Sequence, residues 1–81
     1  MAMSGEEFVA ACRAWRPGAA YDFPALLNWA LAHLPVDRIE LATEFEVSPS
    51  TITRWSSGET TPPVRIQEFV IGRLEKRGGR G

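Results

Sequence analysis

Apolar residues recur along this chain at spacings of three and four residues, the pattern that gathers them on one face of a helix. Proline and glycine divide the pattern into short blocks, and none of the blocks alternates over a useful length as a strand would. We therefore predict an all-α protein of five short helices, folded as a single domain over residues 1–81. The predicted helices cover about residues 4–15, 23–34, 38–45, 49–57 and 63–76.

Local signals mark the ends of these helices. Polar residues that can accept a hydrogen bond from the first turn precede four of them: Ser4, Asp22, Asp37 and Ser48. Glu7 and Glu40 each follow three residues after such a cap, which predicts two reciprocal capping boxes. Pro24 and Pro49 fall in first turns, where the missing N–H costs nothing, and Gly58 suits a left-handed closing residue.

The aromatic residues and the single cysteine are expected mainly in the core. Trp55 occupies an inward helical position, and Trp15 and Trp29 also fall on apolar faces, although one of these two could line a dimer surface. Cys12 is expected to be a small buried apolar group rather than a reactive thiol.

The last predicted helix has more apolar positions than one inward face needs. The residues predicted to face inward are Ile66, Phe69, Val70 and Leu74. Val64 and Ile71, seven residues apart, form a second apolar line, and surplus apolar surface is typical of a contact site. The predicted homodimer interface therefore consists of Val64, Glu68 and Ile71, with the first helix as the alternative.

Residues 38–58 carry the most specific pattern. Two helices are joined by a three-residue turn, the small Ala42 lies where they cross, and Gly58 closes the second. The apolar residues that fill the wedge between them are Leu41, Phe45, Val47, Ile52 and Trp55. The outward positions of the second helix are small and polar or basic. A short polar helix held rigidly by another is what the major groove of DNA accepts.

This block resembles the helix-turn-helix of the phage-repressor and Cro-like (lambda-repressor-like) family of bacterial and phage regulators. The resemblance rests on Leu41-Ala42, the run Val47-Ser-Pro-Ser-Thr-Ile52, the pair Arg54-Trp55 and Gly58, and it covers about half of the chain. The helix count before and after agrees with the family, with the helix at 4–15 as an addition. Glu46 departs from it, because the family usually has glycine in the turn. This implies a shifted turn or strain on the order of 1 kcal/mol.

The resemblance implies a role for each exposed residue of the motif. The positions that read bases in the family are occupied here by Pro49, Ser50 and Arg54. Arg54 alone can make a two-pronged contact to guanine O6 and N7, worth about 1–3 kcal/mol of discrimination. The residues expected at phosphates or thymine methyl groups are Arg38, Ser48, Thr51, Thr53, Ser57 and Thr60. Arg54 could instead be a solvated surface arginine or a partner of Glu59.

Charge and composition narrow the function further. A net charge of −1 argues against a protein that holds nucleic acid mainly by bulk electrostatics. Positive charge is displaced toward the end, where a basic tail could follow a phosphate backbone or only solubilise the chain; its basic residues are Arg73, Lys76, Arg77 and Arg80. With one cysteine and one histidine, we expect no disulfide, metal, cofactor or enzymatic activity. Without a bilayer-length apolar run or a signal peptide, we expect a cytoplasmic protein. The family resemblance implies a bacterial or phage origin.

Two functions remain open. The first is a small repressor or autorepressor that binds double-stranded DNA at a palindromic operator as a homodimer, with half-sites about 34 Å apart. The second is a protein-interaction module or antitoxin with weak or no DNA binding. The acidic net charge, Glu44 and Glu46 near the turn, and the non-donating Pro49 favour the second.

Overall fold

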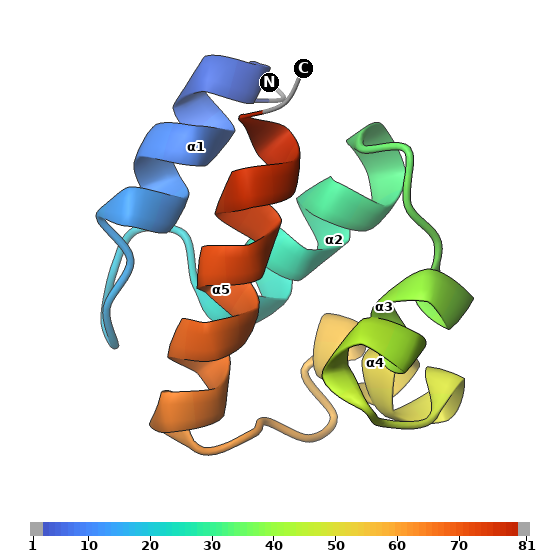
Figure 1. The fold of residues 1–81 in the computed structure, drawn as a ribbon. Helices are drawn as coiled ribbons and strands as arrows, with labels where there is room; N and C mark the ends of the chain where they lie inside the picture. The colour runs from blue at the N-terminus through green and yellow to red at the C-terminus, as the bar shows by residue number, and fades with distance from the viewer. Residues whose placement is uncertain (1–2, 80–81) are drawn as a thin grey trace.

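A computed structural model describes residues 3–79, and within this range all regular secondary structure is helical. The helices are α1 (Gly5–Arg13), α2 (Phe23–His33), α3 (Arg38–Phe45), α4 (Pro49–Ser57) and α5 (Val64–Gly78) (Figure 1). The prediction of five helices is confirmed, and the bounds of α3 and α4 agree with it. Helix α1 ends at Arg13 rather than Trp15, and α5 extends two residues beyond Lys76.

The helix starts follow the predicted caps. Ser4 and Glu7 form both hydrogen bonds of a capping box, and the side chains of Asp22, Asp37 and Ser48 each accept from the amide three residues later. The second predicted capping box was wrong. The Glu40 side chain extends toward α5, where its Oε2 lies 3.8 Å from Arg77 Nη1. At this helix an ion pair with α5 takes the place of the predicted hydrogen bond between the Glu40 side chain and the Asp37 backbone amide.

Helices α1 and α5 lie side by side, α2 passes behind them, and α3 and α4 form a pair on the other side of the molecule, where α4 packs against α2 (Figure 1). One core joins all five helices. Its largest fully buried side chains are Phe8, Phe23, Leu26, Leu27, Leu41, Ile52, Leu74 and Val70. Cys12 and Trp55 are buried as predicted, whereas Trp15 and Trp29 are only partly buried. Trp29 stacks on Phe8 at a ring-centroid distance of 4.3 Å, and its indole N–H donates to the Met3 carbonyl.

The orientation of α5 differs from the predicted one. Ile66 and Phe69 are 40% and 50% exposed, whereas Ile71 is only 2% exposed. The inward face centres on Val70, Ile71 and Leu74 because α5 packs in the groove between α1 and α2. Phe69 therefore lies on a flank, with its ring edge-to-face against Phe45 at 5.9 Å. Both the predicted burial of Ile66 and Phe69 and the predicted interface role of Ile71 were wrong.

Across residues 3–79, no helix combines the length and the apolar character that crossing a bilayer would require.

Candidate nucleic-acid interface

Helices α3 and α4 are joined by the turn at residues 46–48, and we call these three segments the helix-turn-helix unit. Core contacts hold the unit in place. Ile52 is fully buried, and the Trp55 ring, 6% exposed, meets Phe23 of α2 edge-on at a centroid distance of 5.8 Å. The side-chain amide of Asn28, also on α2, donates to the Ser56 carbonyl. Ala42 is buried in the core, and α3 packs against α4. These contacts fix the orientation of α4 on its inner side and leave its outer side free.

The turn adopts the left-handed backbone conformation at Glu46, and the strain expected from a non-glycine residue at this position is therefore present. Glu46 has φ 57° and ψ 45°, and it is the one non-glycine residue with positive φ among residues 3–79. The left-handed conformation lets the Val47 amide donate to the Ala42 carbonyl at 2.9 Å, which closes α3. A glycine would adopt this conformation without strain, because it has no Cβ to be crowded. The turn is therefore formed without its usual residue.

The outer face of α4 brings the predicted base-reading residues together. The exposed residues of this face, which we call the α4 outer face, are Pro49, Ser50, Thr53, Arg54 and Ser57. Two hydroxyls on it donate back to their own helix, Thr53 Oγ1 to the Pro49 carbonyl and Ser57 Oγ to the Arg54 carbonyl. In this arrangement their oxygens can only accept, which suits an amino group of cytosine or adenine.

The first turn of α4 has little free hydrogen-bonding capacity. Ser48 Oγ accepts from the Thr51 amide at 3.2 Å and is hydrogen-bonded to Thr51 Oγ1 at 2.9 Å. Pro49 has no N–H. Within the described part of the chain, the Ser50 amide is then the free N–H of this turn. One of these two hydroxyls donates to the other, so only one of their two protons remains available to a phosphate without breaking that contact.

Arg54 lies at the exposed edge of the α4 outer face. Its Nε is 3.9 Å from Glu59 Oε2, and the two side chains are 55% and 70% exposed. Because the two atoms are far apart for an ion pair and both side chains are exposed, the pair contributes about 1 kcal/mol of stability at most, and salt screens it. The alternative pairing with Glu59 is thus present, but it is weak enough for a guanine to displace. Thr60 lies close by, with its amide directed at the Arg54 carbonyl.

The start of α3 is a poorer phosphate site than the resemblance implies. Arg38 is exposed in the first turn, as a phosphate contact requires. However, Asp37 Oδ1 accepts from the Glu40 amide at 2.8 Å, so a carboxylate already occupies this helix end. A phosphate placed on the same amides would be repelled by that charge. Arg38 can therefore contact DNA through its guanidinium but without help from the helix end.

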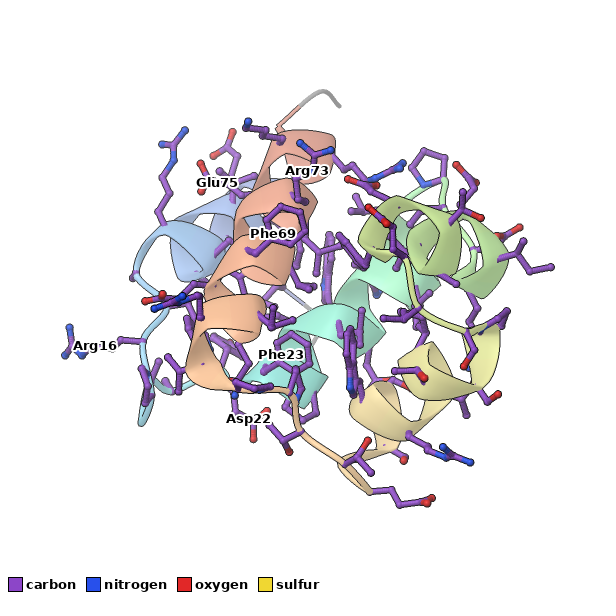
Figure 2. All side chains as sticks on the ribbon, turned by 60° about the horizontal axis from the view of Figure 1, so that its bottom comes forward. Arg16, Asp22, Phe23, Phe69, Arg73 and Glu75 are labelled. Carbon is purple, nitrogen blue, oxygen red and sulfur yellow. The ribbon has the colours of Figure 1, made fainter. Side chains whose placement is uncertain are left out.

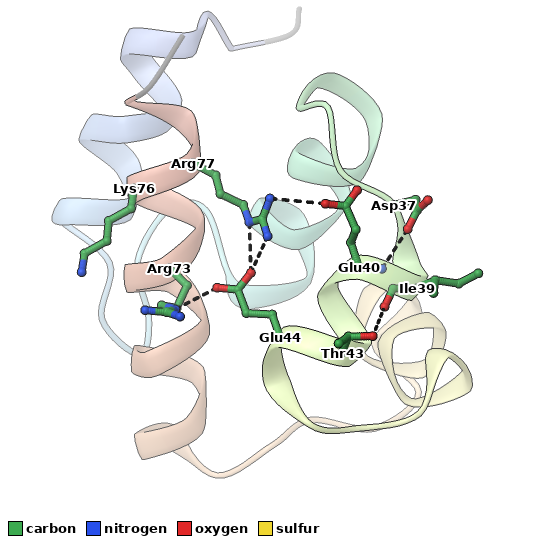
Figure 3. A pocket seen from close by; sticks show the side chains of 8 residues that line it. All are labelled: Asp37, Ile39, Glu40, Thr43, Glu44, Arg73, Lys76 and Arg77. Atoms are coloured by element: carbon green, nitrogen blue, oxygen red, sulfur yellow. Dashed lines mark hydrogen bonds and ion pairs between the residues drawn. The ribbon is translucent and has the colours of Figure 1, made fainter.

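Part of the predicted basic tail is held by an internal ion pair instead. Arg73 Nε donates to Glu44 Oε2 at 2.8 Å, and Arg77 Nη2 donates to Glu44 Oε1 at 2.6 Å (Figure 3). Burial raises the pKa of the Glu44 carboxyl, but the hydrogen bonds and charges of Arg77 and Arg73 outweigh this, so its pKa is lowered. Arg80 lies outside the described residues.

This cluster lines an open groove of about 660 Å³ between α3 and α5. The groove has three acidic and three basic side chains, of which Lys76 makes no ion pair within residues 3–79 (Figure 3). Its charges balance, so it does not select an anion. Sequence reasoning missed the cluster because Glu44 and Arg73 are 29 residues apart, and only the packing of α5 brings them together.

Other candidate chemistry is sparse. No group of three or more histidine, cysteine and acidic residues within the described range could hold a metal ion. Burial, with a smaller effect of the Glu75 charge, raises the pKa of the Cys12 thiol to about 12. The His33 ring rests against Trp29 at 4.6 Å. The α4 outer face therefore stands out as the candidate functional surface.

No protein-family model, curated protein or solved structure matches this chain.

Proposed function

We propose that this chain is a small sequence-specific DNA-binding regulator that inserts α4 into the major groove and represses transcription as a homodimer on a palindromic site. The observation that carries the proposal is the α4 outer face. It presents small polar side chains and one arginine, whereas Ile52 and Trp55 anchor the opposite side of the helix in the core. The resemblance of residues 41–58 to the phage-repressor and Cro-like family supports the same assignment.

Each part of the face has a role in this proposal. Arg54 reads guanine through a two-pronged hydrogen bond, and Ser50 and Thr53 accept from neighbouring amino groups or contact a thymine methyl. Arg38 and Thr60 contact phosphates on either side of the unit and so set its register on the duplex. Pro49 contributes only apolar contact, since it lacks a donor.

A second function has specific support, namely a protein-interaction module or antitoxin that retains the helix-turn-helix fold. Glu59 lies beside Arg54, Glu46 is exposed in the turn and Asp37 caps the start of α3, so the helix-turn-helix unit and its flanks carry three exposed carboxylates. Like charges repel a phosphate backbone, so these residues favour a protein partner. We rank this function second because Arg54 is exposed and its pairing with Glu59 is weak.

The experiment that separates the two is selection of bound duplexes from a random DNA pool, at low salt, with the bound fraction sequenced. Wild type, Arg54→Ala and the control Arg16→Ala would run in parallel. Arg16 is also exposed but lies in the loop before α2, away from α4, and its substitution removes the same charge. The positions of Arg16 and of the neighbouring Asp22 can be followed in Figure 2.

The regulator proposal expects a palindromic motif for wild type and for Arg16→Ala, and loss of one guanine from the motif for Arg54→Ala. Affinity for the selected site should fall with salt, by about 0.9 log units per log unit of salt for each phosphate neutralised. If no sequence is enriched over the input pool, the proposal is refuted. Equal loss of binding in both variants would mean that Arg54 contributes charge without reading a base.

A further inference from the structure

Gly72 lies in the middle of α5, where a helix rarely has a glycine. It is the ninth of fifteen helical residues, where glycine is among the least favourable choices. Its φ is not positive, and a Cβ built on it would meet nothing within 4 Å. Neither backbone conformation nor packing within the chain requires a glycine there. The missing side chain leaves a gap on the helix surface that lets another backbone approach closely.

Gly72 lies in a stripe on the side of α5 that faces away from α2. Residues 65, 69, 72 and 76 follow one another at spacings of four, three and four, so they line up along this side of the helix. Phe69, half exposed, stands one turn before Gly72 and is visible on this side in Figure 2. An exposed aromatic ring beside a gap is the kind of anchor that buried interfaces use. Arg65 and Lys76 end the stripe.

The charges around this stripe are complementary to a second copy of itself. Two helices packed antiparallel about a two-fold axis at Gly72 bring each residue opposite the one equally far on the other side of Gly72. Glu68, four residues before Gly72, then faces Lys76 of the second copy, four residues after it. Symmetry repeats this pair. Within residues 3–79 neither Glu68 nor Lys76 has an ion-pair partner of its own chain.

We propose that two copies of this chain associate through the outer stripe of α5, antiparallel, with Gly72 at the axis and two Glu68–Lys76 ion pairs between the copies. This surface keeps Glu68 of the interface predicted from the sequence but not Ile71, which is buried, nor Val64, which lies outside the stripe. The dimer itself is argued without DNA. Its biological purpose rests on the proposed DNA-binding function, because a two-fold dimer presents two α4 helices to a palindrome.

A charge exchange tests this without DNA. The full chain is measured by sedimentation equilibrium from about 1 µM to several hundred µM, where mass action populates the dimer. The variants are Glu68→Lys, Lys76→Glu and the double exchange, with Arg16→Glu as a control that changes the charge as much as Lys76→Glu does. All three positions are exposed and unpaired in the described residues, so circular dichroism should show the wild-type helix content.

Each single variant should raise the dimer dissociation constant about tenfold or more, since it replaces two attractions with two repulsions. The double exchange should restore it to within about threefold of wild type, and Arg16→Glu should leave it unchanged. A wild-type chain that stays monomeric overturns the proposal, as does a double exchange as weak as the singles. Because DNA is absent, failure of the DNA selection leaves this result standing, and the reverse also holds.

Discussion

Replacing Glu44 with glutamine tests whether the ion cluster between α3 and α5 stabilises the helix-turn-helix unit. The Glu44 side chain is 16% exposed and accepts three hydrogen bonds, from Arg73 Nε, Arg77 Nε and Arg77 Nη2. Hydrogen bonds to a charged group contribute about 1.5–3 kcal/mol when buried, and exposed ion pairs about 0.2–1 kcal/mol. Arg73 is 45% and Arg77 32% exposed, so the value must be discounted for solvent screening.

We therefore expect Glu44→Gln to lower the free energy of unfolding by about 1–2 kcal/mol at pH 7. For a chain of this size that corresponds to a Tm lower by roughly 4–15 °C. Urea titration followed by tryptophan fluorescence measures the change, because Trp55 is buried against the unit. Glu46→Gln is the matched control. It makes the same chemical change two residues away at an exposed, unpaired position of the described chain, so its effect should stay within about 0.5 kcal/mol.

The pH dependence gives the sharper result. The folded pKa of Glu44 is lowered from its ordinary value of 4.5, so its stabilisation is complete above that value. The stabilisation is lost as pH falls from about 4.5 through the lower folded pKa, as the carboxyl becomes protonated. Wild type and Glu44→Gln should therefore converge in stability in acid. A difference that is no larger than that of Glu46→Gln at pH 7, or one that persists undiminished in acid, would refute the reasoning.

Three further outcomes follow from backbone and burial. Glu46→Gly should raise stability by about 0.5–1 kcal/mol in urea titrations, because relief of the left-handed strain exceeds the extra entropy of the unfolded chain. Replacing glycine with alanine should change the stability of the monomer in opposite directions at two positions of α5, as measured by thermal unfolding. Gly72→Ala should stabilise by up to about 1 kcal/mol, as its Cβ meets nothing. Gly78→Ala should destabilise by about 1–3 kcal/mol, since its Cβ would lie 2.9 Å from the buried Phe8 ring. Cys12, with its thiol pKa raised to about 12, should react with a thiol reagent at pH 8 only at the rate of global unfolding.

Helix positions were predictable because their signals are local. The caps at Asp22, Asp37 and Ser48 and the closing Gly58 each act within a few residues of sequence, and the structure forms every one of them. The inward positions of α4 were predictable for the same reason, since Ile52 and Trp55 lie three residues apart on one short face. Ser50, Thr53 and Arg54 could therefore be expected on the outward side before any tertiary contact was known. The choice of Pro49, Ser50 and Arg54 as base-reading residues came from the family resemblance and not from this spacing.

The orientation of α5 could not be predicted in this way. A fifteen-residue helix with apolar residues at 64, 66, 69, 70, 71 and 74 has two plausible inward faces, and local spacing does not choose between them. Packing in the groove between α1 and α2 buries Ile71 and turns Phe69 outward. Likewise, Glu44, Arg73 and Arg77 become partners only through that packing. Arg73 and Arg77 were taken for part of a basic tail because the sequence does not show that Glu44 neutralises them in the folded chain.

This neutralisation shapes how the chain could hold DNA. Arg73 and Arg77 are engaged by Glu44, and Arg54 has Glu59 close by, so Arg38 is the one basic residue of α3 and α4 without an ion pair within residues 3–79. Since each phosphate contact adds to affinity, a monomer should bind weakly, and doubling the contacts by dimerisation becomes the main source of affinity. Together, DNA binding by α4 and dimerisation through α5 predict how Glu68→Lys changes the affinity for DNA. This variant gains positive charge, which alone would tighten DNA binding, but it breaks the proposed dimer. Fluorescence anisotropy on the selected palindrome should show weaker binding than wild type. Tighter binding would mean that bulk charge, and not the α5 contact, controls the affinity.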